Sequence, residues 1–122
     1  MFTKQLIKHI ASPKILALLI LSFSFNMPAQ AADTWASCTP NQVMSFTQRI
    51  HVRCASAIGK ISYFALSTQN AQLAARTLSL ISTAQVAGRT LTVLYDPADL
   101  SGASIGCLTS DCRLIHAIGF GQ

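Results

Sequence analysis

The sequence predicts a mainly β fold with one helix (α+β), arranged as a small barrel of four to five strands with the helix between strands 3 and 4. Two observations predict this class, and a third indicates how its small core is stabilised. Several short segments alternate apolar and polar residues or are rich in β-branched and aromatic residues, which is typical of strands. Residues 70–87 instead follow a period of about 3.6 residues, which is typical of an amphipathic helix. Four cysteines in a short chain favour disulfides as a supplement to a small core.

The first 31 residues have the composition of a secretory signal peptide. Lys4, Lys8 and Lys14 flank the start of an apolar run, Ile15–Phe25, and small residues close the segment at Ala31. The apolar run is roughly 11 residues long, whereas a membrane-spanning helix needs roughly 20. We therefore expect cleavage after Ala31 and a periplasmic or secreted product without a membrane segment. An uncleaved membrane anchor is the alternative.

Removal of residues 1–31 from the 122-residue chain leaves residues 32–122, which is the length of one small domain. The formal net charge of +5 is misleading, because three of the nine Lys and Arg residues lie in the leader. The remaining six are scattered singly and form no basic cluster. We therefore expect no nucleic-acid partner.

Residues 49–67 predict a β-hairpin. Ile50, Val52 and Cys54 alternate with polar residues, and Ala57-Ile58-Gly59 provides the turn. The segment that follows, Lys60–Ser67, is rich in β-branched and aromatic residues, as strands are. An earlier strand is expected somewhere in residues 35–46.

Residues 70–87 predict the helix. Thr68 or Asn70 can cap its start, and Gly88 stands where a left-handed C-terminal cap belongs. The segment carries no charge except Arg76. We therefore expect the helix to be covered on more than one side, either by its own sheet or by neighbouring subunits.

Two further strands are expected after the helix. Arg89–Tyr95 alternates and ends at Asp96-Pro97, and a final strand covers Arg113–Phe120. The stretch between them, Ala98–Gly106, has no period and is expected to be a surface loop. This order of strands, one helix and strands fits a closed or half-closed barrel of the OB type, so residues 32–122 are expected to form a single OB-like domain.

All four cysteines, Cys38, Cys54, Cys107 and Cys112, lie after the leader. An even number in an exported chain predicts two disulfides. Three pairings are open, and closeness in the sequence favours Cys107 with Cys112 and hence Cys38 with Cys54. The spacing of Cys107 and Cys112 fits neither a zinc half-site nor a Cys-x-x-Cys redox centre, so we expect no metal and no cofactor.

No acid and base occur at a recognisable catalytic spacing, so the sequence predicts a non-enzymatic protein, with a small hydrolase as the alternative. His51 is expected to be solvated on the polar side of its strand. His116 shares a face with Leu114 and Ile118, and we expect it in the core or at an interface. Glutamate is absent, and the remaining candidates for catalysis are Cys54, Asp33, Asp96, Asp99 and Asp111.

Three features from Ile61 onward also occur together in one family. They are the strand Ile61-Ser62-Tyr63-Phe64-Ala65 followed by a helix, the segment from Gly88 to Tyr95-Asp96-Pro97, and the closely spaced Cys107 and Cys112. In these features the chain resembles the family of subtilase cytotoxin B subunits. The resemblance covers about half of residues 32–122. It implies an exported OB-fold component of an A-B toxin that assembles as a homo-pentamer and binds sialylated glycans.

The resemblance also implies that Tyr95 contacts a sugar, offering its ring to one apolar face and its hydroxyl to a hydrogen bond. The residues alone allow a different role, a strand-end aromatic side chain that packs on the barrel. We therefore expect a non-enzymatic binding protein whose partner is a cell-surface glycan or another protein. A periplasmic structural or interaction protein with the same fold and no sugar site is the alternative.

Overall fold

The computed structural model describes residues 32–121, so the predicted signal peptide, residues 1–31, lies outside the described range. The described residues form a mainly β fold with one α-helix, as predicted. No helix in this range is long and apolar enough to cross a membrane. In chain order the elements are β1 (Thr34–Cys38), β2 (Pro40–Ser45), β3 (Arg49–Ile58), β4 (Ile61–Ser67), α3 (Ala71–Ala87), β5 (Leu91–Tyr95), the 3-10 helix η1 (Ser101–Ile105), β6 (Cys112–Leu114) and β7 (Ala117–Gly119).

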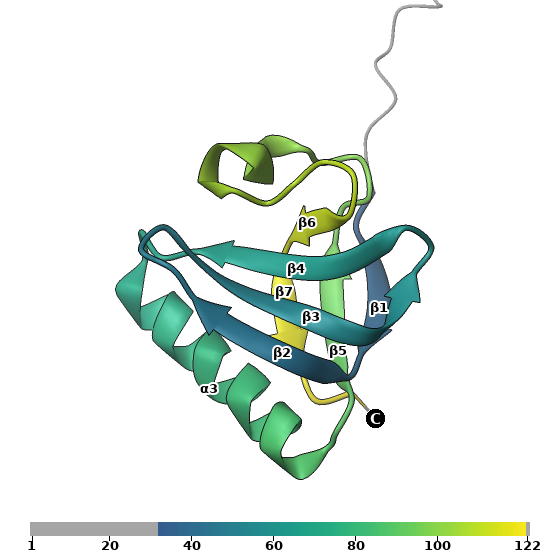
Figure 1. The fold of residues 1–122 in the computed structure, drawn as a ribbon, viewed down its shortest axis with the longest axis vertical. Helices are drawn as coiled ribbons and strands as arrows, with labels where there is room; N and C mark the ends of the chain where they lie inside the picture. The colour runs from purple at the N-terminus through teal and green to yellow at the C-terminus, as the bar shows by residue number, and fades with distance from the viewer. Residues whose placement is uncertain (1–31, 122) are drawn as a thin grey trace, which may run out of the picture. The chain divides into compact units, whose positions relative to one another are not determined.

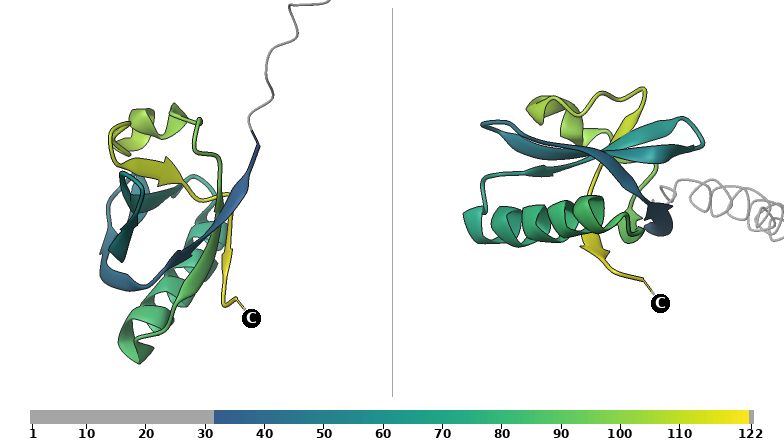
Figure 2. Two further views of the ribbon diagram at one scale, coloured as in Figure 1. Left: turned by 90° about the vertical axis from the view of Figure 1, so that its right-hand side faces the viewer. Right: turned by 60° about the horizontal axis from the view of Figure 1, so that its bottom comes forward.

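The strands form two sheets, one with the order β1-β5-β7 and one with the order β2-β3-β4-β6. All pairs are antiparallel except β4 with β6. The helix lies at one end of the strands, and the segment that contains η1 lies at the opposite end (Figures 1 and 2). The strand ladders therefore make two sheets and not one closed barrel.

Two short stretches of chain carry the backbone from one sheet to the other. Thr39 separates β1 from β2. Ile115 donates its N–H to the carbonyl oxygen of Ala65 in one sheet, and the next residue, His116, donates its N–H to that of Leu94 in the other, each over 2.8 Å. The two sheets therefore meet at two corners, and the path around them runs β2, β3, β4, β6/β7, β5 and β1.

Two predicted strands are each divided in the structure, one at each corner. The early strand expected in residues 35–46 is divided into β1 and β2, and Pro40 begins β2. Proline cannot donate a backbone hydrogen bond, so the first position of a strand accommodates it. The final strand expected over Arg113–Phe120 is divided into β6 and β7 at the second corner, because consecutive residues there bond to different sheets.

The predicted hairpin and helix are confirmed. Gly59 makes the hairpin turn with a φ of 60°, a left-handed conformation that glycine adopts without strain. Asn70 caps the helix, since its side-chain oxygen accepts a hydrogen bond from the N–H of Leu73 at 3.0 Å. Gly88 ends the helix in the left-handed conformation, with a φ of 66°.

The predicted surface loop, residues 98–106, contains η1; Arg113 bonds residues on both sides of it and Arg49 bonds the loop itself. Arg113 is buried, and its guanidinium donates to three carbonyl oxygens at 2.6–2.8 Å, those of Pro97, Thr109 and Cys112. Arg49 donates from Nη1 to the carbonyl oxygen of Ile105 at 3.0 Å. Charged donors form strong hydrogen bonds, so this loop has a defined position despite its irregular sequence.

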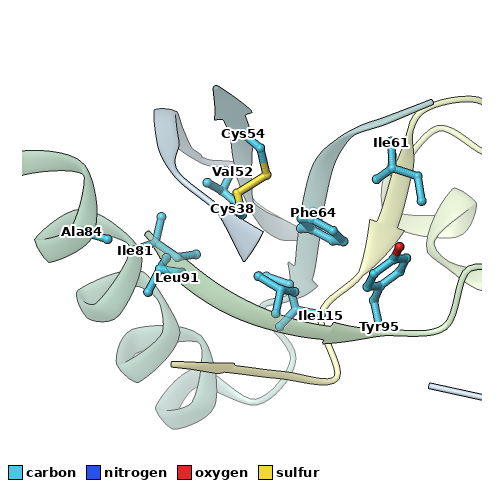
Figure 3. Close-up of a cluster of buried hydrophobic side chains, with 11 residues drawn as sticks. Cys38, Val52, Cys54, Ile61, Phe64, Ile81, Ala84, Leu91, Tyr95 and Ile115 are labelled. Carbon is cyan, nitrogen blue, oxygen red and sulfur yellow. A yellow bond between two sulfur atoms is a disulfide. The ribbon is translucent and has the colours of Figure 1, made fainter. Parts of the chain in front are cut away.

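The core lies between the two sheets and the helix (Figure 3). Phe64, Ile81 and Leu91 are fully buried in it. The disulfide between Cys38 and Cys54 belongs to the same cluster.

The second disulfide, between Cys107 and Cys112, is also buried and packs with Ala65 in a smaller cluster. These are the two pairings that closeness in the sequence favours.

Replacement of Phe64 tests the packing of this core. Phe64→Ala should lower the free energy of unfolding by about 3–5 kcal/mol, because the ring is completely buried and its loss leaves a cavity. Urea unfolding followed by circular dichroism measures this change. As the matched control, Val86→Ala should change stability by less than about 0.5 kcal/mol, because Val86 is 90% exposed. Equal effects of the two substitutions would contradict the assigned core.

Candidate functional site

An open cavity of about 650 Å³ lies on the outer face of the sheet β1-β5-β7. It is lined by Trp35 of β1, Thr92 of β5 and residues 117–121. We call this cavity and its lining residues the Trp35 groove.

The alternation of β5 explains which side chains reach the groove. Leu91, Val93 and Tyr95 are buried, so Thr92 and Leu94 point to the opposite face. Trp35 pairs with Leu94, and residues that stand directly opposite each other share a face of the sheet. The outer face therefore carries Trp35 beside Leu94 of β5, and the smaller residues Ala117 and Gly119 follow on β7.

Two aromatic side chains bound the groove. Trp35 is 60% exposed and Phe120 is 36% exposed. The guanidinium carbon of Arg89 lies 4.6 Å from the centroid of the Phe120 ring, and this cation–π contact favours one orientation of the ring. A side chain at Gly119 would meet nothing within 4 Å, so the floor beside the rings is open.

The groove suits a ligand with a flat apolar face and a polar edge. The exposed indole offers an apolar surface for stacking and an N–H that can donate a hydrogen bond. Thr92 and Arg89 add a hydroxyl and a cation near the rings. Concave, mostly apolar sites with a few polar groups are typical of small-ligand binding.

Tyr95, to which the resemblance assigns a sugar contact, is not part of this surface. Its side chain is 5% exposed and packs edge-to-face on Phe64, with the ring centroids 5.1 Å apart. Figure 3 shows the ring pointing into the buried cluster. Tyr95 therefore packs in the core, which is the alternative role that the residues alone allow, and its ring has no face available for a sugar.

His116 is exposed, so the expectation that it lies in the core is wrong, whereas a position at an interface stays a prediction. It lies at the second corner, where the change of sheets turns its side chain outward. Its Nδ1 is 2.8 Å from an oxygen of Asp33, and its Nε2 is 3.5 Å from an oxygen of Asp99. Hydrogen bonds from Ser101, and to a lesser extent His116, lower the pKa of Asp99.

His51 is half-buried, although the sequence predicts a solvated side chain. Its ring lies between Phe46 and Tyr63, with centroid distances of 5.8 and 4.6 Å. Burial lowers the pKa of His51 below its ordinary value of 6.5, and the positive charge of Arg49 lowers it further, while Asp111 opposes the shift. The lowered pKa favours the neutral form of His51 near pH 7.

The structure does not bring the other predicted candidates together. Within residues 32–121, no three His, Cys, Asp or Glu side chains are grouped as a metal ion would require. Cys54 is bonded to Cys38, so it is not a free nucleophile. Asp33 and Asp99 lie beside His116, whereas Asp111 lies beside a different cavity with His51.

Sequence reasoning missed both aromatic residues of the Trp35 groove. A usable signal exists for Trp35: it stands three residues before Cys38, so the alternation of a strand places it on the face opposite a buried cysteine. Phe120 carries no comparable signal, because the alternation predicted for residues 113–120 breaks at the second corner.

Comparisons with protein-family models, curated proteins and solved structures found no match for this chain. The function is therefore argued from the surfaces described above.

The lowered pKa of His51 predicts a loss of stability in mild acid. The unfolded chain takes up a proton near pH 6.5, whereas the folded chain does so only at lower pH, so protonation favours unfolding. The contribution of His51 is complete above pH 6.5 and declines as the pH falls below this value. The pKa of Asp99 is lowered from 3.8, so protonation of Asp99 affects stability only in stronger acid.

Urea unfolding at pH 7.5 and pH 5.5 measures this effect. The wild-type chain should lose more stability between these pH values than His51→Phe, which keeps an aromatic ring between Phe46 and Tyr63 but cannot titrate. His116→Asn should retain the pH dependence that arises from His51. An unchanged pH dependence in His51→Phe would show that His51 is not the group responsible.

Proposed function

We propose that the protein is an exported, non-enzymatic binding protein of the toxin B-subunit type that recognises glycans through the Trp35 groove. The observation that carries this proposal is the exposed pair Trp35 and Phe120 on a sheet face with a floor of small residues. Large aromatic side chains are stabilised by burial, so their exposure at a defined groove favours a binding role. No cofactor takes part in the proposed function.

Two features support a periplasmic or secreted location. The leader, residues 1–31, has the pattern of an export signal. The described domain contains two disulfides, and disulfides form and persist in oxidising compartments. The proposed site of action is therefore outside the cytosol.

The resemblance to toxin B subunits gains support from the strand path. If β1 and β2 count as one bent strand, and β6 and β7 as another, the order of strands and the helix after β4 follow an OB-type barrel. The resemblance also implies a homo-pentamer. The outer surface of α3 carries no charge apart from Arg76, and it includes Ala75, Ser79 and Val86, so it is compatible with burial between neighbouring copies.

A second candidate is a periplasmic structural or interaction protein that has this fold but no sugar site. The burial of Tyr95 favours it, because the residue that the resemblance assigns to sugar contact is unavailable. Light scattering after size exclusion separates the candidates in part, because a pentamer supports the toxin type.

The chain offers a direct test, because Trp35 is its only tryptophan. Labelled mature protein, residues 32–122, should bind a subset of glycans on an array. Titration of the best-bound glycan should then change the fluorescence of Trp35. Trp35→Ala should weaken binding about tenfold or more, since loss of an apolar stacking surface costs roughly 1.5–3 kcal/mol.

Gly119→Val should also weaken binding, because it adds a side chain to the floor of the groove, where a Cβ would meet no atom within 4 Å. Lys60→Ala, a change at an exposed residue in the turn between β3 and β4, is the control and should bind as the wild type does. The absence of binding to every glycan at micromolar concentration would refute the proposal, as would equal binding by Trp35→Ala.

A further inference from the structure

We infer that a second cavity, on the outer face of the sheet β2-β3-β4-β6, binds a small carboxylate that also carries a hydrogen-bond donor. The cavity has a volume of about 250 Å³. Arg49, His51, Tyr63 and Asp111 line it, and we call it the Arg49 pocket. It lies on the other sheet from the Trp35 groove and is independent of the proposed function.

The guanidinium of Arg49 is held in a fixed plane. Its central carbon lies 3.9 Å from the centroid of the Phe46 ring, and the group also packs closely against Gly106. Nη1 donates to the carbonyl oxygen of Ile105 at 3.0 Å. One edge of the group is therefore used by the protein, and the orientation of the opposite edge is already set.

That opposite edge consists of Nε and Nη2. Nε is buried and has no hydrogen-bond partner among residues 32–121. The N–H groups of Nε and Nη2 form a parallel fork whose spacing matches the two oxygens of a carboxylate. Because a buried donor without a partner is unfavourable, this edge indicates a group that the structure is built to receive.

His51 adds a second polar atom of the same kind. Its Nδ1 is buried and also lacks a partner within the described range. Arg49 and His51 are two residues apart on β3, so their side chains share the outer face of the sheet. Two unpaired buried nitrogens on neighbouring side chains of one cavity favour a ligand with more than one polar atom.

Asp111 gives the pocket a second charge, of opposite sign. Its carbonyl oxygen accepts hydrogen bonds from the N–H groups of Ser62 and Tyr63 at 2.9 and 3.1 Å, which fixes its position beside β4. The salt bridges between described residues involve His116 and neither Arg49 nor Asp111. The guanidinium of Arg49 and the carboxylate of Asp111 line one small cavity. Together they suit a ligand with a carboxylate at one end and a hydroxyl or ammonium at the other.

The buried nitrogens are shielded from water, so binding requires a side chain at the rim to move. Leu108 lines the cavity and is 64% exposed, which leaves it free to do so. Binding should therefore change the surroundings of His51 directly.

Proton NMR of the mature protein tests the inference through its two histidines. The ring signal of His51 should shift saturably with lactate, which has a carboxylate and a hydroxyl. Acetate, which lacks the hydroxyl, should bind more weakly, and lactamide, which lacks the charge, should have no effect. Glycine, with an ammonium in place of the hydroxyl, tests which donor is preferred. The signal of His116, which contacts Asp33 and Asp99, serves as the internal control.

Substitutions separate the roles of the two charges. Arg49→Lys keeps the charge but removes the fork, and it should weaken lactate binding at least tenfold. Asp111→Asn should abolish the preference for lactate over acetate. This substitution leaves the contacts of Arg49 with Phe46 and Ile105 in place. Arg53→Lys changes an exposed arginine on the same face and should bind lactate as the wild type does.

Three results would overturn the inference. They are equal shifts with lactate and lactamide, parallel shifts of His51 and His116, and wild-type binding by Asp111→Asn with an unchanged preference.

Discussion

The disulfide between Cys38 and Cys54 is the constraint on which the rest of the structure depends. Cys38 ends β1 in one sheet and Cys54 lies on β3 in the other, so this bond joins the two sheets covalently. Both sulfur atoms are buried in the same cluster as Phe64 and Leu91. A domain of this size has a small core, so side-chain packing alone stabilises it only weakly. A disulfide inside the core adds stability because it restricts the unfolded chain.

The inward position of these two cysteines also determines what the outer faces present. Trp35 precedes Cys38 by three residues and His51 precedes Cys54 by three, and an odd spacing along a strand places a side chain on the opposite face. The Trp35 groove and the Arg49 pocket therefore lie on the outer faces of the two sheets that the disulfide joins. Each cavity therefore lies on the face opposite a cysteine that points into the core.

Features that depend on nearby residues could be predicted from the sequence, and features that depend on distant ones could not. The helix with its Asn70 and Gly88 caps follows from local pattern. The corner at Ile115 and His116 depends on carbonyl groups of β4 and β5 that are distant in the sequence. Because that corner was not visible, a single strand was predicted over residues 113–120 and His116 was expected away from the exposed surface that it occupies.

The most direct test of this account compares the loss of each disulfide. Replacement of Cys38 and Cys54 by alanine should lower the free energy of unfolding by about 3 kcal/mol or more, since the bond closes the longer loop and lies in the main core. Replacement of Cys107 and Cys112 should cost about 2 kcal/mol and leave unfolding cooperative. Urea unfolding of both double variants measures these values. An equal or larger loss in the second variant would contradict the central role of the bond between the sheets.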